Sequence, residues 1–205
     1  YFKSNIDVVL SDMAVNTTGI KNIDAIYTGE LCKEAMIFSK TILKNNGKFI
    51  SKIFLAPMYE ITDVSFRLLC KKYGAGLTFT EMLSPMALAR GNKSTLRLFD
   101  VQFKERPVGI QLMGQNVEEI KKAIKVVENK VDIIDFNFGC PVENIVKQGA
   151  GAALLKRPEK IREIIRAAKS VTKVPISIKI RSGWDKKSIN AVEIAKIAEE
   201  EGCCF

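Results

Sequence analysis

Histidine is absent from the 205 residues of the chain, and this absence narrows the possible chemistry. Without histidine there is no Ser-His-Asp or Cys-His catalytic arrangement, and the commonest zinc and iron sites lose their usual ligand. Proton transfer must therefore use Cys, Lys, Asp, Glu or Tyr. The five cysteines form no Cys-x-x-Cys pair, so we expect reduced thiols, no disulfide framework and no metal site.

Long apolar runs are also missing. No stretch approaches the roughly 18 residues that a membrane-spanning helix needs, and the first residues lack the layout of a signal peptide. We therefore expect a cytoplasmic protein with no membrane partner. The chain starts at Tyr1 and ends on apolar residues, which favours the interpretation that it is a fragment.

Acidic residues are fewer than basic ones, 23 against 32, and most of the resulting net charge of +9 lies after residue 52. Such an excess suits a polyanionic partner such as RNA. Charge alone leaves the question open, because many basic proteins bind no nucleic acid.

Short apolar segments alternate with longer amphipathic ones after residue 52. This alternation indicates parallel strands joined by helices, the α/β class. The expected strands are residues 53–57, 77–80, 107–112, 131–136 and 175–180, and the clearest helices are 117–128, 158–171 and 188–201. With residues 202–205 as the start of a further strand, we count five to six strand-helix units.

Polar residues at the ends of the predicted strands distinguish two α/β architectures. These residues are Met58, Glu81, Gln111, Asn137, Cys140, Lys179 and Arg181. In a barrel, the loops after the strands form one catalytic rim, whereas a doubly wound sheet gathers polar residues at one or two crevices. No G-x-G-x-x-G follows any predicted strand. We therefore predict a partial (β/α)8 TIM barrel over residues 53–205.

Residues 1–52 have a different pattern. A strand at 6–12, a helix at 30–43 and a strand at 48–54 predict a strand-helix-strand fragment of a Rossmann-like fold. No Pro- or Ser-rich linker separates it from the barrel-like part, so the boundary between the two predicted domains falls inside an apolar strand. Natural domain boundaries rarely lie in such a place.

Cys140 lies in a tight turn, Asn137-Phe138-Gly139-Cys140-Pro141, directly after a predicted strand. A thiol with an ordinary pKa near 8.5 is mostly protonated at neutral pH and could give up a proton to a substrate. The alternative is a buried structural cysteine before a turn proline. Both interpretations are consistent with these residues alone.

Lys179 and Arg181 alternate with isoleucines and therefore face one side of their strand. Charges on the inner side of a barrel must meet either a bound anion or a carboxylate, here Asp135 or Glu81. Gln111 could contact the edge of a heterocycle or simply satisfy loop backbone. The glycine-rich residues 149–153 could approach a ring or a phosphate closely, or form a tight packing corner.

Together these motifs resemble the tRNA-dihydrouridine synthase family, over residues 53–205. The motifs are Leu55-Ala56-Pro57-Met58, Thr62-Asp63, Phe66-Arg67, Thr80-Glu81-Met82, Gln111-Leu112-Met113-Gly114, Asp135-Phe136-Asn137-Phe138-Gly139-Cys140-Pro141, Gly149-Ala150-Gly151-Ala152-Ala153-Leu154-Leu155 and Lys179-Ile180-Arg181-Ser182-Gly183. The resemblance implies an FMN enzyme that takes a hydride from NADPH or NADH and reduces the 5,6 double bond of uridine in tRNA.

The same resemblance implies roles for individual residues. Cys140 would be the general acid on the face of the uracil opposite the flavin. Lys179 would stabilise negative charge near the flavin and uracil. The remaining expected contacts are Ala56, Pro57, Met58 and Gln111 to the flavin, and Asn137 and Arg181 to the uracil.

Residues 1–54 resemble the large-subunit ribosomal RNA 2'-O-ribose methyltransferases instead. The resemblance rests on residues 9–19, Asp24, residues 30–31 and residues 47–54, and it places Asp12 and Lys52 in that family's catalytic set. Val15 replaces the usual proline. The Gly-rich S-adenosylmethionine loop and the first catalytic lysine would precede Tyr1, so we expect no methyltransferase activity.

By the same reasoning the barrel part is expected to be incomplete. The family's later histidine, its phosphate-binding loops and its C-terminal helical domain would all follow residue 205. Two alternatives therefore stay open: a non-catalytic remnant that binds RNA weakly, and a flavin barrel that reduces a small pyrimidine. The sequence does not predict an oligomeric state.

Overall fold

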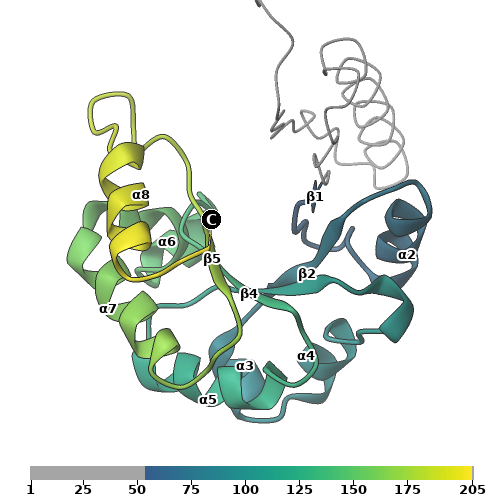
Figure 1. The fold of residues 1–205 in the computed structure, drawn as a ribbon. Helices are drawn as coiled ribbons and strands as arrows, with labels where there is room; N and C mark the ends of the chain where they lie inside the picture. Colours follow the sequence, from purple (N-terminus) through teal and green to yellow (C-terminus); the bar gives the residue numbers. More distant parts are fainter. Residues whose placement is uncertain (1–53, 205) are drawn as a thin grey trace, which may run out of the picture.

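The strands form one curled parallel sheet in a computed structural model, which describes residues 54–204 (Figure 1). Their spatial order, β1-β2-β3-β4-β5, is their order in the chain, and all four pairings are parallel. The bounds are β1 Phe54–Leu55, β2 Leu77–Leu83, β3 Val108–Leu112, β4 Ile133–Asn137 and β5 Ile176–Lys179. The sheet is the α/β half-barrel that the alternating pattern predicts. The strand-helix-strand fragment predicted for residues 1–52 lies outside the described residues.

Helices line the convex side of the curled sheet (Figure 1). Their bounds are α2 Val64–Lys72, α3 Pro85–Ala89, α4 Lys93–Leu98, α5 Val117–Val127, α6 Glu143–Lys147, α7 Pro158–Lys169 and α8 Ala191–Glu200, with 3-10 turns at η1 Phe103–Glu105 and η2 Gly151–Lys156. No helix among residues 54–204 is both long enough and apolar enough to cross a membrane.

Local chemistry fixes where the longer helices begin. The Asn116 side chain accepts hydrogen bonds from the backbone N–H groups of Glu118 and Glu119 and so caps α5. Pro158 occupies the first position of α7, where its missing N–H costs nothing. The last predicted helix starts at Ala191, three residues later than expected, because residues 182–190 form a compact loop.

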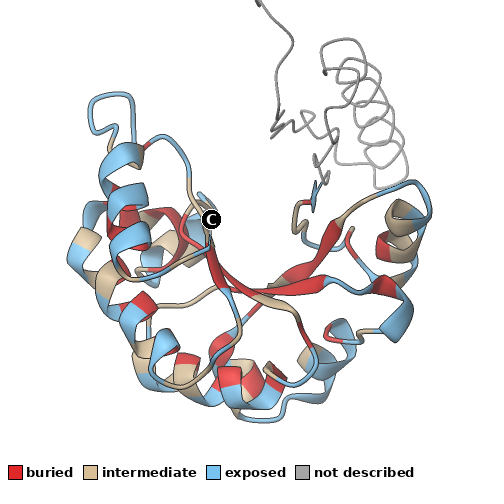
Figure 2. Cartoon of the chain, in the orientation of Figure 1, coloured by how far each residue is buried: buried red, intermediate tan, exposed pale blue. Residues whose placement is uncertain are grey.

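The core lies between the convex face of the sheet and the helices (Figure 2). Along β3, Ile110 and Leu112 belong to this core, and Gly109 and Gln111 lie on the other face because side chains alternate along a strand. The helices contribute buried isoleucines, among them Ile124 of α5. Each such side chain contributes roughly 1.5–3 kcal/mol by leaving water.

The end of the described chain returns to the sheet beside β5. The backbone N–H of Cys204 donates to the carbonyl of Ile176 at 2.7 Å. The Cys204 thiol lies 3.1 Å from the same carbonyl, and no strand is assigned at residues 202–204, where a sixth strand was expected to start.

Candidate functional site

The concave face of the sheet carries polar side chains on three adjacent strands. The strand register sets Asp135 of β4 between Gln111 of β3 and Ser177 of β5, and it sets Asn137 opposite Lys179. In parallel barrels the carboxyl edge of the strands carries the functional loops. Five of the predicted site residues therefore lie on or just beyond the same edge: Gln111, Asn137, Cys140, Lys179 and Arg181.

Four side chains of this face form a directional chain of hydrogen bonds. The Gln111 Nε2 group donates to Asp135 Oδ2 at 2.5 Å, and Gln111 Oε1 accepts from Asn137 Nδ2 at 2.9 Å. Ser177 Oγ donates to the other carboxylate oxygen, Asp135 Oδ1, at 2.7 Å. All four side chains are buried. Both ends of the Gln111 amide are therefore engaged within the chain.

The turn that carries Cys140 is held by the last residue of β4. Asn137 Oδ1 accepts from the backbone N–H of Gly139 at 3.0 Å and of Cys140 at 2.8 Å. Asn137 Nδ2 also lies 3.1 Å from the sulfur of Met82. The hydrogen-bonding capacity of the Asn137 side chain is thus used within the chain, and a direct bond to uracil would replace one of these contacts.

Gly151 permits a second close contact behind this turn. Its φ of +57° suits glycine, and a Cβ there would lie 2.6 Å from the carbonyl oxygen of Cys140. That oxygen accepts from the backbone N–H of Ala152 at 2.9 Å. The glycine-rich segment is therefore a packing corner against the Cys140 turn. The Cys140 thiol itself is half-buried and makes no hydrogen bond to any residue of the part described.

Lys179 and Arg181 form no ion pair within residues 54–204. Lys179 is half-buried and Arg181 is exposed. The carboxylates considered as partners are engaged elsewhere: Asp135 binds Gln111 and Ser177, and Glu81 Oε2 accepts from the backbone N–H of Glu60 at 2.5 Å. Both cations are therefore available to a bound anion.

Ala56, Pro57 and Met58 begin the loop between β1 and α2, and all three are half-buried. The Thr62 hydroxyl lies 3.1 Å from the Met58 nitrogen and donates to the Met58 carbonyl at 3.0 Å. Glu60 has a φ of +58°, and its backbone N–H donates to the Glu81 carboxylate. The loop is thus shaped by side chains that the chain itself supplies.

A buried ion pair anchors the far side of the same loop. Arg67 Nε lies 2.5 Å from Glu105 Oε2, and both side chains are almost fully buried. Arg67 Nη1 donates to the Thr62 carbonyl at 2.7 Å, and Nη2 donates to the Asp100 carbonyl at 2.5 Å. Arg67 belongs to a motif that the sequence singles out, but its partner Glu105, 38 residues away, carries no such signal.

Asp135 has the most altered environment among the acids of this edge. Burial raises its pKa to about 6, against the opposing effects of the Gln111 and Ser177 hydrogen bonds and of the positive charge of Lys179. From the sequence, Asp135 was expected as a possible salt-bridge partner and as part of the motif that ends in Cys140, but not as the centre of a hydrogen-bond network. A carboxylate and a serine within otherwise apolar strands are the signal that could have identified this network.

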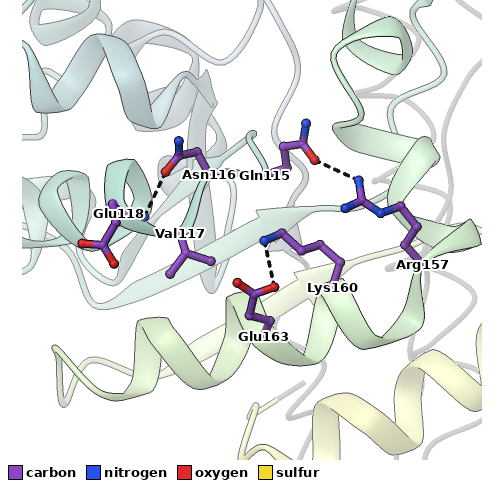
Figure 3. Close-up of a pocket in the computed structure, with 7 residues that line it drawn as sticks. All are labelled: Gln115, Asn116, Val117, Glu118, Arg157, Lys160 and Glu163. Atoms are coloured by element: carbon purple, nitrogen blue, oxygen red, sulfur yellow. Dashed lines mark hydrogen bonds and ion pairs between the residues drawn. The ribbon is translucent and has the colours of Figure 1, made fainter.

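A separate hollow of about 480 Å³ lies beside the N-terminal ends of α5 and α7 (Figure 3). Its lining residues are Gln115, Asn116, Val117, Glu118, Arg157, Lys160 and Glu163. Gln115 accepts from Arg157 at 3.0 Å, and Lys160 pairs with Glu163 at 2.8 Å, so its polar groups largely satisfy one another. None of the predicted site residues lines it.

Within residues 54–204 no group of three or more His, Cys, Asp or Glu side chains is arranged so that it could hold a metal ion. A parallel α/β half-barrel with convergent polar groups at the strand ends defines the chain as a TIM-barrel type of protein.

Comparison with known proteins narrows this class to one family. The chain belongs to the dihydrouridine synthase family, a family of oxidoreductases, whose model "Dihydrouridine synthase (Dus)" matches residues 54–205. A second model, "FtsJ-like methyltransferase", matches residues 1–75.

Curated relatives carry the same family identity. The chain is 46% identical to "tRNA-dihydrouridine synthase B" of Pasteurella multocida over 156 residues, which are 74% of this chain and 46% of that protein. Proteins of the same name match from Pseudomonas putida, 40% identical over 78% of this chain and 46% of the relative, and from Vibrio vulnificus, 39% identical over 77% and 49%. The chain thus spans about half the length of the curated relatives that it matches.

Proposed function

We propose that the chain carries the catalytic edge of a tRNA-dihydrouridine synthase, an enzyme that reduces the 5,6 double bond of uridine in tRNA with FMN and NADPH or NADH. One observation carries the proposal: Cys140, Lys179 and Arg181 lie at neighbouring strand ends with no hydrogen-bond or ion-pair partner for their side chains among residues 54–204. A thiol and two free cations at one edge suit a ring that gains a proton and negative charge.

The residues present fit the ring system of FMN. Lys179 offers a half-buried ammonium group with no ion pair among residues 54–204, and Gln111, on the neighbouring strand β3, would contact the ring by exchanging one of its present hydrogen bonds. Ala56, Pro57 and Met58 would form the floor beneath the ring, on the loop held by Thr62. FMN, when bound, would supply the hydride that reaches the uracil.

The chain's own residues would then supply the rest. The Cys140 thiol would donate a proton to C5 of the uracil, and the positive charge of Lys179 would stabilise negative charge on the adjacent carbonyl. Arg181 would orient the uracil directly. Asn137, whose side chain is already fully hydrogen-bonded, would orient it through the Cys140 turn.

An RNA partner is supported by the loop that follows β5. Arg181, Lys186 and Lys187 are exposed and lack ion-pair partners within residues 54–204. The loop is ordered by Asp185, whose Oδ1 accepts from the backbone N–H of Lys187 at 2.8 Å and of Ser188 at 2.9 Å. Lys156 lies 3.6 Å from the centre of the Trp184 ring. Such a basic, aromatic-containing loop beside the reacting groups suits a phosphate backbone.

The visible absorption spectrum of the purified chain tests the cofactor first. We expect flavin absorption after purification or after incubation with FMN, and Lys179→Ala should weaken binding by about 10-fold or more. A chain that stays colourless at excess FMN would contradict the proposal and favour a non-catalytic RNA-binding remnant. Reduction of free uracil in the absence of tRNA would favour a small-pyrimidine reductase.

A further inference from the structure

The carboxylate of Asp135 is a buried acid of the concave face that the proposed chemistry does not use. It is 4% exposed and lies between two polar neighbours on the adjacent strands. Its two oxygens accept from Gln111 and Ser177 at 2.5 and 2.7 Å. Burying a carboxylate costs free energy unless hydrogen bonds compensate for the lost water. The groups that donate to Asp135 therefore indicate its role.

Direction is the informative property of these hydrogen bonds. An ionised carboxylate only accepts, so the NH₂ end of the Gln111 amide must face Asp135. The Gln111 oxygen then faces Asn137 and accepts from its Nδ2, at 2.9 Å. Consequently the Asn137 oxygen faces the turn, where it accepts from the N–H of Gly139 and Cys140. If the Gln111 amide were reversed, its NH₂ group would face the NH₂ group of Asn137. If the Asn137 amide were reversed, its NH₂ group would face the backbone N–H groups of the turn.

We propose that Asp135 is a positioning residue that fixes the orientation of the Gln111 and Asn137 amides and thereby holds the backbone turn that presents Cys140. The role of Cys140 as an acid rests on the proposed function, whereas the hydrogen-bond relay itself does not. Asp135 reaches the thiol only through two intermediate side chains, each of which has a single orientation compatible with its neighbours.

Charge on Asp135 is needed only to make it an acceptor. The positive charge of Lys179 lowers the pKa of Asp135, and the negative charge of Asp135 contributes to the raised pKa of Cys203. Asparagine at position 135 could keep an oxygen toward Gln111 and turn its NH₂ to the Ser177 hydroxyl, which can accept as well as donate. Orientation and charge can therefore be separated by substitution.

Hydrogen exchange of the purified chain, resolved by peptide, tests the relay without flavin or substrate. In Asp135→Ala the amides of Gly139 and Cys140 should exchange at least about 10-fold faster, while those of α5 keep their rates. Asp135→Asn and the control Ser177→Ala should leave the turn within about 3-fold of the parent chain. The alkylation rate of Cys140, measured relative to that of Cys70 in the same sample, should change most in Asp135→Ala and little in Asp135→Asn and Ser177→Ala.

Unchanged exchange at the turn in Asp135→Ala would overturn the proposal, as would an increase spread equally over α5 and the sheet. Equal acceleration in Asp135→Asn and Asp135→Ala would show that charge, not orientation, matters. If Asp135→Ala does not fold, Gln111→Met interrupts the relay at its centre and carries the same expectations. Loss of flavin binding with an intact relay would count against the proposed function alone.

Discussion

The side-chain oxygen of Asn137 lies 2.8 Å from the backbone nitrogen of Cys140, so the residue that ends β4 also holds the turn that follows it. Strand and loop are thereby joined by a side chain rather than by backbone pairing alone. The thiol is left without a partner in the described residues, at an edge where two cations are also free.

Cys140→Ala should lower uridine reduction in unmodified tRNA by about 100-fold or more, because a positioned proton donor contributes on that order. Flavin binding should persist, since Cys140 makes no side-chain contact that shapes the floor residues. The measurement is dihydrouridine formation by the chain supplied with FMN, NADPH and tRNA. Cys70→Ala, on α2, is the matched control. Full activity in Cys140→Ala would remove the thiol from the mechanism.

Replacing Lys186 and Lys187 together by glutamine should weaken tRNA binding and make it less dependent on salt. Each lost phosphate contact reduces the slope of log K against log salt by roughly 0.7–0.9. Filter binding at several salt concentrations measures this slope. The control is Lys121→Gln with Lys122→Gln on α5, on the convex side of the sheet. Equal effects of both pairs would indicate non-specific attraction.

Asp135→Asn should change how stability depends on pH. Because burial raises the folded-state pKa to about 6 from an ordinary 3.8, the protonated acid is favoured in the folded state. The parent chain should therefore lose stability, relative to Asp135→Asn, as pH rises from about 4 to about 7, by up to about 3 kcal/mol. Urea unfolding at several pH values measures the difference. A pH-independent difference would mean that the pKa of Asp135 is not raised.

Gly151→Ala should destabilise the chain by at least about 1 kcal/mol more than Gly74→Ala. Both glycines have positive φ, but only at Gly151 would a Cβ meet the Cys140 carbonyl, at 2.6 Å, whereas nothing lies within 4 Å at Gly74. The comparison isolates the clash from the backbone strain. Denaturant unfolding with similar midpoints for the two variants would contradict this packing.

Arg67→Met should cost about 3–5 kcal/mol, because Glu105 would remain buried without its partner. Arg106→Met is the control: its pair with Asp132, at 3.4 Å, is partly exposed and should contribute at most about 1 kcal/mol. Adding Glu105→Leu to Arg67→Met should recover part of the lost stability. The free energy of unfolding measured in urea would decide, and similar costs for Arg67→Met and Arg106→Met would refute the assignment.

Much of the fold could be predicted because parallel strands and their helices differ in hydrophobic period. The order of short apolar and longer amphipathic segments identified the order of strands and helices, and the alternation of Lys179 with isoleucines set it on the face opposite Ile178, which packs against the core. The candidate site was predicted as a set of strand-end residues, but its internal connections were not. Arg67 with Glu105 and Asp135 with Ser177 are partners 38 and 42 residues apart. No local pattern encodes such pairs, since they depend on the tertiary arrangement.

Because the spatial order of the strands follows their order in the chain, the hydrogen-bond network can form strand by strand. Gln111, Asp135, Asn137 and Ser177 lie on three strands that are consecutive both in the chain and in the sheet. Each new unit docks onto one that has already been made, so β5 completes the set of hydrogen-bond partners as it leaves the ribosome. The contacts that orient Cys140 can thus assemble in the order of synthesis, and each step closes only the chain segment between two successive strands.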